Sequence, residues 1–181
     1  MIETARLILR PWRDSDIPIF VDIGRDPDVM RYFPNLLTPE ATAEGVGRIR
    51  GHFEREGWGL FAVEIKGGPE FVGFCGIQRV PFEAAFTPAV EIGWRMGRAS
   101  WGHGYATEGA RACLDFARDT LHLEEVLAMV VPDNTRSIAV MQRLGMTYVE
   151  GADFDHPRVP EGQISVGGFP ARRHRLYRIR P

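Results

Sequence analysis

Residues 91–107 read EIGWRMGRASWGHGYAT, and this stretch decides the fold. A β pattern ends near Met96, a short glycine-rich turn follows, and an amphipathic helix begins near Gly104. Such a turn directs unpaired backbone N–H groups and the positive end of a helix dipole toward one point, which favours an anion. Gly102 and Gly104 let a phosphate approach the backbone closely. The spacing predicts a pyrophosphate site, with an ordinary helix start as the alternative.

Two common phosphate-binding loops do not match this turn. The P-loop pattern requires Gly-Lys-Ser/Thr, which is absent from residues 101–108. The dinucleotide fingerprint requires a third glycine at the position of Thr107. Neither a P-loop nucleotidase nor a classical dinucleotide-binding enzyme is therefore expected.

The rest of the chain predicts an α/β fold with a mixed sheet. The expected strands are 3–11, 59–66, 70–80, 89–96, 126–131, 146–150 and 173–180, and residues 151–171 form a long loop. Helices are expected after a cap at Asp14 or Ser15, after the cap Thr38, over 106–121, and between Asn134 and Gly145. This order differs from the regular βα alternation of a doubly wound fold. Three consecutive antiparallel strands are the expected centre of the sheet.

Length and composition favour one domain over residues 1–181. The chain has 181 residues, of which 44% are hydrophobic and 25% charged, as in ordinary globular proteins. No apolar run is long enough to span a bilayer, and the charged N-terminus does not resemble a secretory signal, so a cytoplasmic protein is expected. Cys75 and Cys113 lack partners at metal-ligand spacing and are expected to be small buried residues, with no metal site.

Charge argues against a general nucleic-acid-binding protein. The net charge is −2, although five arginines lie within residues 172–180. Alternation with Leu176 and Tyr177 indicates a final edge strand protected from aggregation by charge. An RNA- or ribosome-associated module is the less favoured alternative, and a homodimer through this strand is a further expectation.

Several linked motifs resemble the GCN5-related N-acetyltransferase (GNAT) superfamily. The motif WGHGYATEGA follows EIGWRM, and a later Asn-x-x-Ser helix from Asn134 ends in LGM at Met146. The opening TARLILRPWRDSD and the segment DPDVMRYFP are similar to the branch containing the ribosomal-protein N-terminal acetyltransferases. The resemblance covers about residues 3–150.

The resemblance implies a single-domain, largely antiparallel sheet, flanked by helices, in which strands 89–96 and 126–131 run parallel and splay apart. Acetyl-CoA is expected between them as the cosubstrate. Its pantetheine arm is expected along the backbone of Trp94 and Met96, with Asn134 and Ser137 nearby. Its pyrophosphate is expected on the amides of Trp101, Gly102, His103, Gly104, Tyr105 and Ala106.

The resemblance implies that Glu91 is the general base, which takes a proton from the acceptor amine through a water. The alternative is a structural ion pair, for example with Arg95. Many relatives donate a proton from a tyrosine at the position of Met141, so this chain lacks that donor. The resemblance assigns Ser137, four residues earlier on the same helix face, a hydrogen bond to the leaving sulfur. A non-catalytic acyl-CoA sensor is therefore a second hypothesis.

The expected acceptor is a primary amine of a protein N-terminus or a small molecule. The acceptor site is expected among the first two helices, residues 81–88 and the segment after Gly151. Phe82, Phe86 and His156 are the candidate substrate contacts, and the sequence does not distinguish among acceptor amines.

Overall fold

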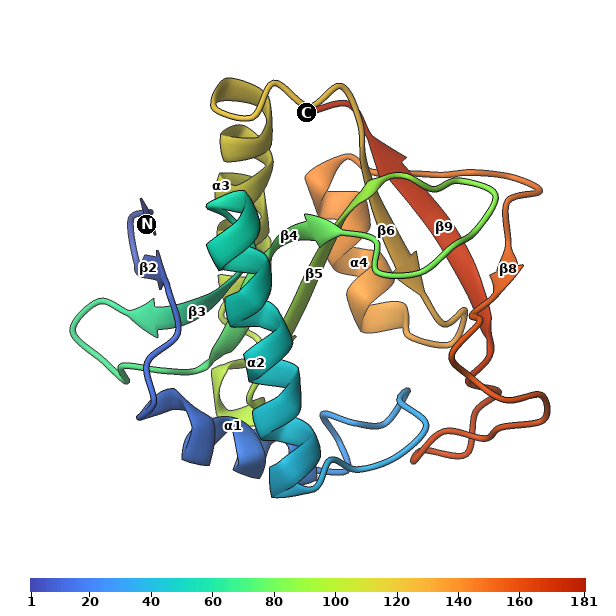
Figure 1. Ribbon diagram of the computed structural model, residues 1–181, viewed down its shortest axis with the longest axis horizontal. Helices are drawn as coiled ribbons and strands as arrows, with labels where there is room; N and C mark the ends of the chain where they lie inside the picture. The colour runs from blue at the N-terminus through green and yellow to red at the C-terminus, as the bar shows by residue number, and fades with distance from the viewer.

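A single nine-stranded sheet organises residues 1–181 in a computed structural model (Figure 1). The strand order is β1-β2-β3-β4-β5-β6-β9-β7, and β8 pairs with β9. The strands are β1 (Ile2–Glu3), β2 (Leu7–Arg10), β3 (Leu60–Ile65), β4 (Gly73–Arg79), β5 (Val90–Met96), β6 (Val126–Val130), β7 (Thr147–Tyr148), β8 (Phe154–Asp155) and β9 (Arg173–Ile179). The helices are α1 (Asp16–Arg25), α2 (Pro39–Glu56), α3 (Tyr105–Asp119) and α4 (Thr135–Leu144), with a short 3₁₀ turn at Arg98–Ser100.

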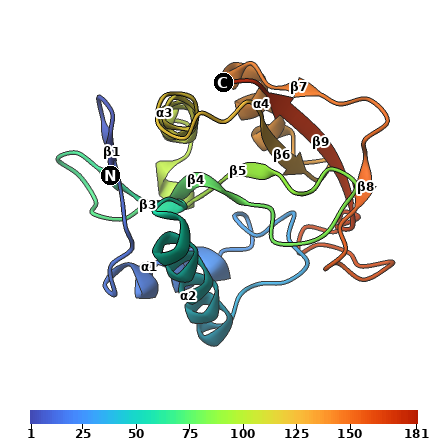
Figure 2. The same cartoon turned by 45° about the horizontal axis from the view of Figure 1, so that its top comes forward.

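Helices cover both faces of the sheet. In Figure 2, α3 and α4 lie on one face, and α1 and α2 lie on the other. All paired strands are antiparallel except β5 and β6, which are parallel. The predicted α/β fold with a largely antiparallel mixed sheet is therefore confirmed. No helix has the length and apolar character needed to cross a membrane.

Capping residues and glycines close to each terminus determine where most helices begin and end. Thr38 Oγ1 accepts a hydrogen bond from Ala41 N at 3.1 Å, and Pro39 occupies the first helical position of α2. Gly57 ends α2 and Gly145 ends α4, both with positive φ. Ser15 precedes α1 as predicted, but its side chain makes no capping hydrogen bond.

The parallel strands β5 and β6 separate along their length. Seven residue pairs join β4 and β5, whereas Glu91–Leu127 is the single register pair between β5 and β6. Gly97 N donates to Val72 O at 2.8 Å, so alternation along β5 directs the backbone groups of Trp94 and Met96 away from β4, toward β6. Beyond Glu91 that edge has no strand partner.

The prediction of a final edge strand is wrong. β9 lies inside the sheet, paired with β6 on one side and with β7 and β8 on the other (Figure 1). Leu176 and Tyr177 are buried because β9 closes the sheet beside β6. The arginines of β9 therefore do not protect a free edge, and β9 offers no free edge for the dimer expected there.

The first predicted strand is divided, and the strand predicted over 146–150 is shorter. Residues 4–6 form a turn between β1 and β2 because Thr4 Oγ1 and Arg6 N both donate to Glu108 of α3, at 2.6 and 2.9 Å. β7 contains only Thr147 and Tyr148. The division of the first strand therefore arises from a contact between segments distant in the chain.

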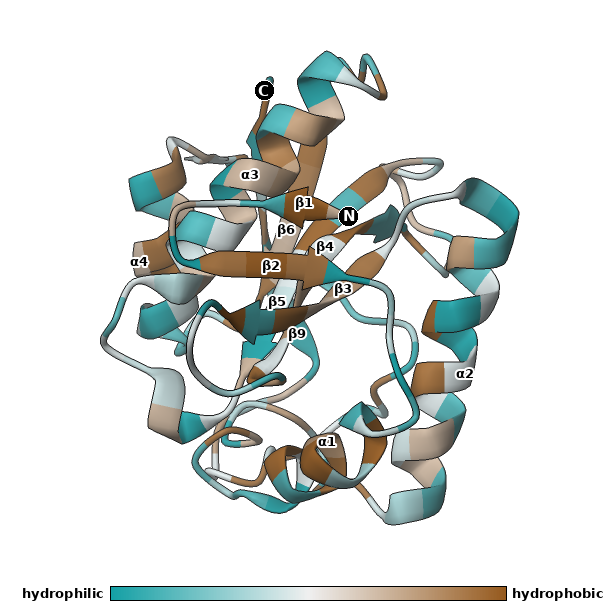
Figure 3. Cartoon of the chain, turned by 90° about the vertical axis from the view of Figure 1, so that its left-hand side faces the viewer, coloured by the Kyte–Doolittle hydropathy of each residue, from teal (hydrophilic) through white to brown (hydrophobic).

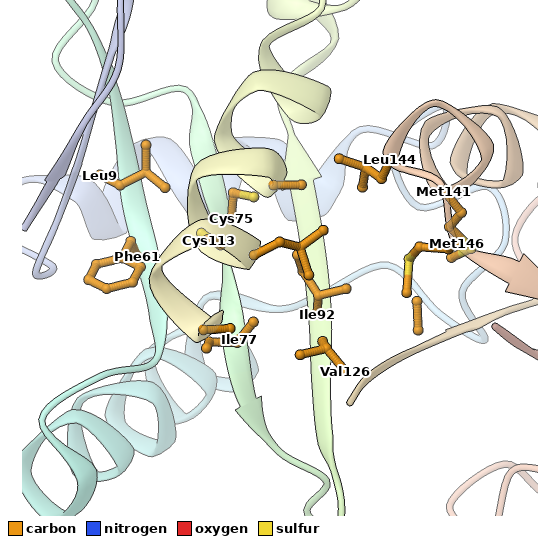
Figure 4. Packing of buried hydrophobic residues seen from close by; sticks show 14 of the residues in the cluster. Leu9, Phe61, Cys75, Ile77, Ile92, Cys113, Val126, Met141, Leu144 and Met146 are labelled. Carbon is orange, nitrogen blue, oxygen red and sulfur yellow. The ribbon is translucent and has the colours of Figure 1, made fainter. Parts of the chain in front are cut away.

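The main core lies between the sheet and helices α3 and α4. Figure 4 shows Ile77 and Ile92 from the sheet packed near Cys113, and Met141 packed near Met146. Cys75 and Cys113 are fully buried, as predicted, and a hydrogen bond between these thiols and their burial raise the pKa of Cys113. In Figure 3 the hydrophobic colour is clear on β2 and β3, while several parts of α2 are coloured hydrophilic.

A buried ion network joins β2 to α1 and β3. The side chains of Arg10 and Asp16 are 4% and 2% exposed, and two hydrogen bonds of 2.8 and 2.9 Å join them. Arg10 Nε also donates to Glu64 Oε2 at 2.9 Å. This guanidinium therefore has carboxylate partners from two elements.

Candidate active site

The glycine-rich turn presents a row of free amides. The N–H groups of residues 102–107 donate to no acceptor in the protein. Gly102 and Gly104 both have φ of +80°, a conformation that glycine adopts without strain. The row adjoins the N-terminus of the 15-residue helix α3, so it is suited to bind an anion.

Trp101 contributes its side chain to this region instead of its amide. Its N–H donates to Arg98 O at 3.1 Å, which corrects the prediction that this amide binds phosphate. The indole Nε1 donates to Met96 O at 2.9 Å, and the Arg136 guanidinium lies 4.6 Å from a ring centroid of Trp101. Trp101 therefore joins the end of β5 to the start of α4.

Contacts from Arg6 in the N-terminal segment hold the glycine-rich turn in place. Arg6 Nη1 donates to His103 O at 3.0 Å, and Arg6 Nη2 lies 2.6 Å from Glu108 Oε2. His103 is exposed and stacks against Tyr105, with ring centroids 5.4 Å apart. The amides therefore have a defined orientation without a ligand, which lowers the entropic cost of binding.

The start of α4 supplies polar groups on the other side of the strand gap. Asn134 Oδ1 accepts a hydrogen bond from Ser137 N at 3.2 Å, so Asn134 caps the helix as predicted. The hydroxyl of Ser137 makes no hydrogen bond within the protein. Met141 is 3% exposed and belongs to the core, so it provides no proton donor.

Glu91 occupies the point where β5 and β6 begin to separate. Its carboxylate accepts a hydrogen bond from Gln78 Nε2 at 2.8 Å and forms no ion pair, so the alternative of a Glu91–Arg95 pair is wrong. Burial raises the pKa of Glu91 to about 7, against the opposing effects of Gln78 and the positive charge of Arg158. A carboxyl with this pKa exchanges protons near neutral pH.

The three predicted substrate contacts come together in the structure. Phe82 and Phe86 have ring centroids 6.3 Å apart, and Phe82 lies 4.7 Å from His156. Phe154 and His174 complete this aromatic cluster. Burial is the main reason that the pKa of His156 falls to about 4, so this ring is neutral at neutral pH.

Loops from three parts of the chain surround this face of β5. Arg158 Nη2 donates to Pro81 O, which ties the late loop to residues 81–88. Val166 N donates to Phe33 O at 2.9 Å, and Gly167 N donates to Arg31 O at 2.8 Å. The segment between α1 and α2, the loop 81–88 and the loop after Gly151 therefore lie where the acceptor site was predicted.

Gln78, Arg158 and His174 are contacts that the sequence did not identify. Gln78 stands opposite Glu91 in the β4–β5 register, so correct pairing of these strands would have revealed it. Arg158 and His174 reach the site only through the path of the late loop and β9. No local pattern marks them.

A mixed sheet whose parallel pair opens beside a turn of free amides fits an acyl-group transferase, and the comparisons with known proteins agree. Residues 6–147 match the family model described as an acetyltransferase (GNAT) domain. The chain belongs to the GNAT family and is an acetyl-CoA-dependent N-acetyltransferase.

Two relatives illustrate the range of the family. YkkB of Bacillus subtilis is 37% identical over 146 residues, which cover 80% of this chain and 84% of YkkB. FsC-acetyl coenzyme A-N(2)-transacetylase of Aspergillus fumigatus is 31% identical over 174 residues, which cover 90% of this chain and 73% of that enzyme.

Solved structures share the fold over nearly the whole chain. An acetyltransferase from Agrobacterium tumefaciens has a TM-score of 0.78 at 26% identity and covers 99% of this chain and 94% of its own. RimL, a ribosomal L7/L12 alpha-N-protein acetyltransferase solved with coenzyme A, has a TM-score of 0.73 at 16% identity. The match covers 97% of this chain and 94% of RimL. At this low identity, the similarity to RimL shows a shared fold and nothing more.

Proposed function

We propose that this enzyme transfers the acetyl group of acetyl-CoA directly to a primary amine, with Glu91 as the general base. The observation that carries the proposal is the row of free amides at residues 102–107, at the end of a strand gap that begins at Glu91. This arrangement supports a phosphate-bearing cosubstrate whose far end reaches the base.

Several groups fit the cosubstrate. The amides of Gly102, His103, Gly104, Tyr105 and Ala106, together with Thr107, suit its pyrophosphate. The unpaired backbone groups at Trp94 and the N–H of Met96 suit its pantetheine amides, and Asn134 borders the same gap. When bound, acetyl-CoA supplies an activated acetyl group.

The residues of the chain have separate tasks in the proposed reaction. Glu91, as the carboxylate, removes a proton from the acceptor ammonium through one water, which yields the nucleophilic amine. Ser137 Oγ, which has no partner in the protein, donates a hydrogen bond to the departing sulfur. Phe82, Phe86 and His156 form one wall of the acceptor site, where a neutral His156 does not repel a cationic amine.

Related names support an amine acceptor without choosing one. RimL is named for a protein N-terminus, and a structural relative from Vibrio cholerae is a spermidine N-acetyltransferase. These relatives are 16% and 14% identical to this chain, so the acceptor of this enzyme is open to small molecules and protein N-termini.

A melting experiment tests cosubstrate binding. Acetyl-CoA at about 100 times its dissociation constant should stabilise the protein by about 2.7 kcal/mol and raise its melting temperature. Release of free CoA thiol with a panel of peptides, polyamines and amino acids then measures transfer. The absence of any melting shift would overturn the proposal.

The same assays separate the enzyme from a non-catalytic acyl-CoA sensor. A sensor would show the melting shift but no amine-dependent thiol release. For an enzyme, Glu91→Gln should keep the shift and reduce transfer at least tenfold, while Glu44→Gln on exposed α2 should leave both unchanged.

A further inference from the structure

One face of β5 holds an open stretch between two charged side chains. Glu91, Gly93 and Arg95 alternate with the core residues of β5 and therefore share a face of the sheet. A Cβ atom added at Gly93 would meet nothing within 4 Å. The Cα atoms of Glu91 and Arg95 are about 13 Å apart along the strand, so the gap can accept an extended molecule.

Arg95 is partly buried and has no partner in the protein. Its Nε is buried and makes no hydrogen bond, and its guanidinium forms no hydrogen bond or ion pair with any other residue. An arginine that is partly removed from water is normally paired, because an isolated charge loses part of its hydration. Arg10 of the same chain follows this rule, with Asp16 and Glu64 as partners.

Aromatic rings hold the Arg95 guanidinium in place. Its central carbon lies 4.1 Å from the centroid of Phe33, and 5.7 and 5.8 Å from those of Phe74 and Phe20. Stacking on a ring leaves the N–H donors in the guanidinium plane free for a ligand. Phe33 is 36% exposed, so this stack stands at an accessible boundary of the fold.

The guanidinium remains a cation at neutral pH. Burial lowers the pKa of Arg95 to about 10, which is still well above neutrality. No carboxylate of the protein compensates this charge. A ligand anion is therefore the group that the site lacks.

The surroundings of Arg95 belong to the acceptor side. Phe33 lies between α1 and α2, and its carbonyl is held by Val166 of the late loop at 2.9 Å. These are two of the segments that surround the face carrying Glu91. The free amides of residues 102–107 instead start α3, which packs on the opposite face of the sheet (Figure 2).

We propose that Arg95 binds a carboxylate of the acceptor, so that the preferred substrates are primary amines that also carry a carboxylate. The amine lies toward Glu91, the open space above Gly93 holds the connecting atoms, and the carboxylate meets the guanidinium. One planar guanidinium matches one carboxylate in both charge and paired donor geometry. This inference rests on the proposed function and assigns its substrate class.

Matched acceptors test the inference. We would compare ω-amino acids of increasing length, short peptides and their C-terminal amides as acceptors of wild-type enzyme, Arg95→Met and Arg95→Lys. The wild type should prefer at least one carboxylate over its amide tenfold or more in kcat/KM. Arg95→Met should abolish this preference, leave the amide within about threefold and leave the KM for acetyl-CoA unchanged. Arg95→Lys should retain part of the preference for the carboxylate over the amide.

Stability and a second variant separate recognition from a structural role. Arg95→Met removes an uncompensated charge and should melt no lower than the wild type, whereas a structural cation would lower the melting temperature. Gly93→Val should raise the KM of carboxylate acceptors, because it fills the open space, without changing the acetyl-CoA melting shift.

The outcomes distinguish the inference from the proposed function. Equal use of carboxylates and amides by the wild type, or a preference that survives in Arg95→Met, overturns the inference while acetyl transfer stands. Absence of transfer to every amine overturns the proposed function. In that case, loss in Arg95→Met of a carboxylate-induced melting shift, measured with CoA present, would still support the anion site.

Discussion

Glu91 and Arg95 show how burial changes a charged residue at different points of one strand. Glu91 has a hydrogen-bond donor in Gln78 but no cation in direct contact, and its pKa rises to about 7. Arg95 has aromatic neighbours and no carboxylate, and its pKa falls to about 10. In both cases desolvation disfavours the charged form, yet the two groups keep charges of opposite sign available near neutral pH.

The titration of Glu91 predicts the pH dependence of catalysis. A general base acts as the carboxylate, so kcat/KM should rise with pH and level off above about 7. Glu91→Gln should remove this limb together with most of the activity. Rates measured from pH 5 to 9 with a fixed acceptor check the prediction, and an unchanged limb in Glu91→Gln would contradict it.

Because of the same carboxyl group, folding stability should fall over the pH range in which kcat/KM rises. The folded-state pKa of Glu91 is above its usual 4.5, so the folded protein binds this proton more tightly than the unfolded chain. The stabilisation of the folded state by this proton is present below pH 4.5 and is lost as pH rises through 7. Relative to wild type, Glu91→Gln should therefore gain up to about 3 kcal/mol between pH 4.5 and 8 in denaturant unfolding.

The turn and the helix that follows it act together as one element. Gly102 and Gly104 adopt positive φ, α3 begins immediately afterwards, and the free amides lie at their junction. Arg6 and Glu108 fasten the turn to β2 and α3. The binding geometry is therefore a property of the element and its two attachments.

Gly104→Ala tests this element. Alanine at φ of +80° costs about 1–2 kcal/mol and should displace the amides, so the affinity for acetyl-CoA should fall about tenfold. Calorimetric titration measures this affinity for acetyl-CoA. Gly47→Ala in exposed α2, where a Cβ meets nothing within 4 Å, should leave affinity unchanged and stabilise by about 0.5–1 kcal/mol. Equal affinities in the two variants would contradict the assignment.

At the scale of the whole molecule, the ion network of Arg10 joins the sheet to α1, a helix on the proposed acceptor side. It connects β2, α1 and β3, and α1 leads into the segment that carries Phe33. The late loop contacts that segment from the other end of the chain. The proposed acceptor site is therefore built from contacts between the N-terminal and C-terminal parts.

Asp16→Ala should destabilise the protein by about 3–5 kcal/mol, because it leaves the Arg10 charge partly uncompensated in the interior. Denaturant unfolding provides the measurement. Asp14→Ala is the matched control: the Asp14 side chain is 90% exposed and pairs with Arg50, so its loss should cost less than about 1 kcal/mol. A cost below 1 kcal/mol for Asp16→Ala would refute the role of the network.

Features of this protein that depend on neighbouring residues could be predicted from the sequence alone. The glycine turn, the Thr38 and Asn134 caps, and the glycine ends of α2 and α4 follow from backbone conformation and hydrogen bonds within a few residues. The family motifs added the gap between β5 and β6. These features were predictable because their causes are local or belong to a shared motif.

The environment of each charge and the partners of each strand became clear only in the folded molecule. β9 lies inside the sheet, Trp101 uses its amide within the turn, and Glu91 does not pair with Arg95. Each outcome depends on segments that are distant in the chain and meet only after folding. Burial and pairing are properties of that assembled environment, so spacing along the chain does not specify them.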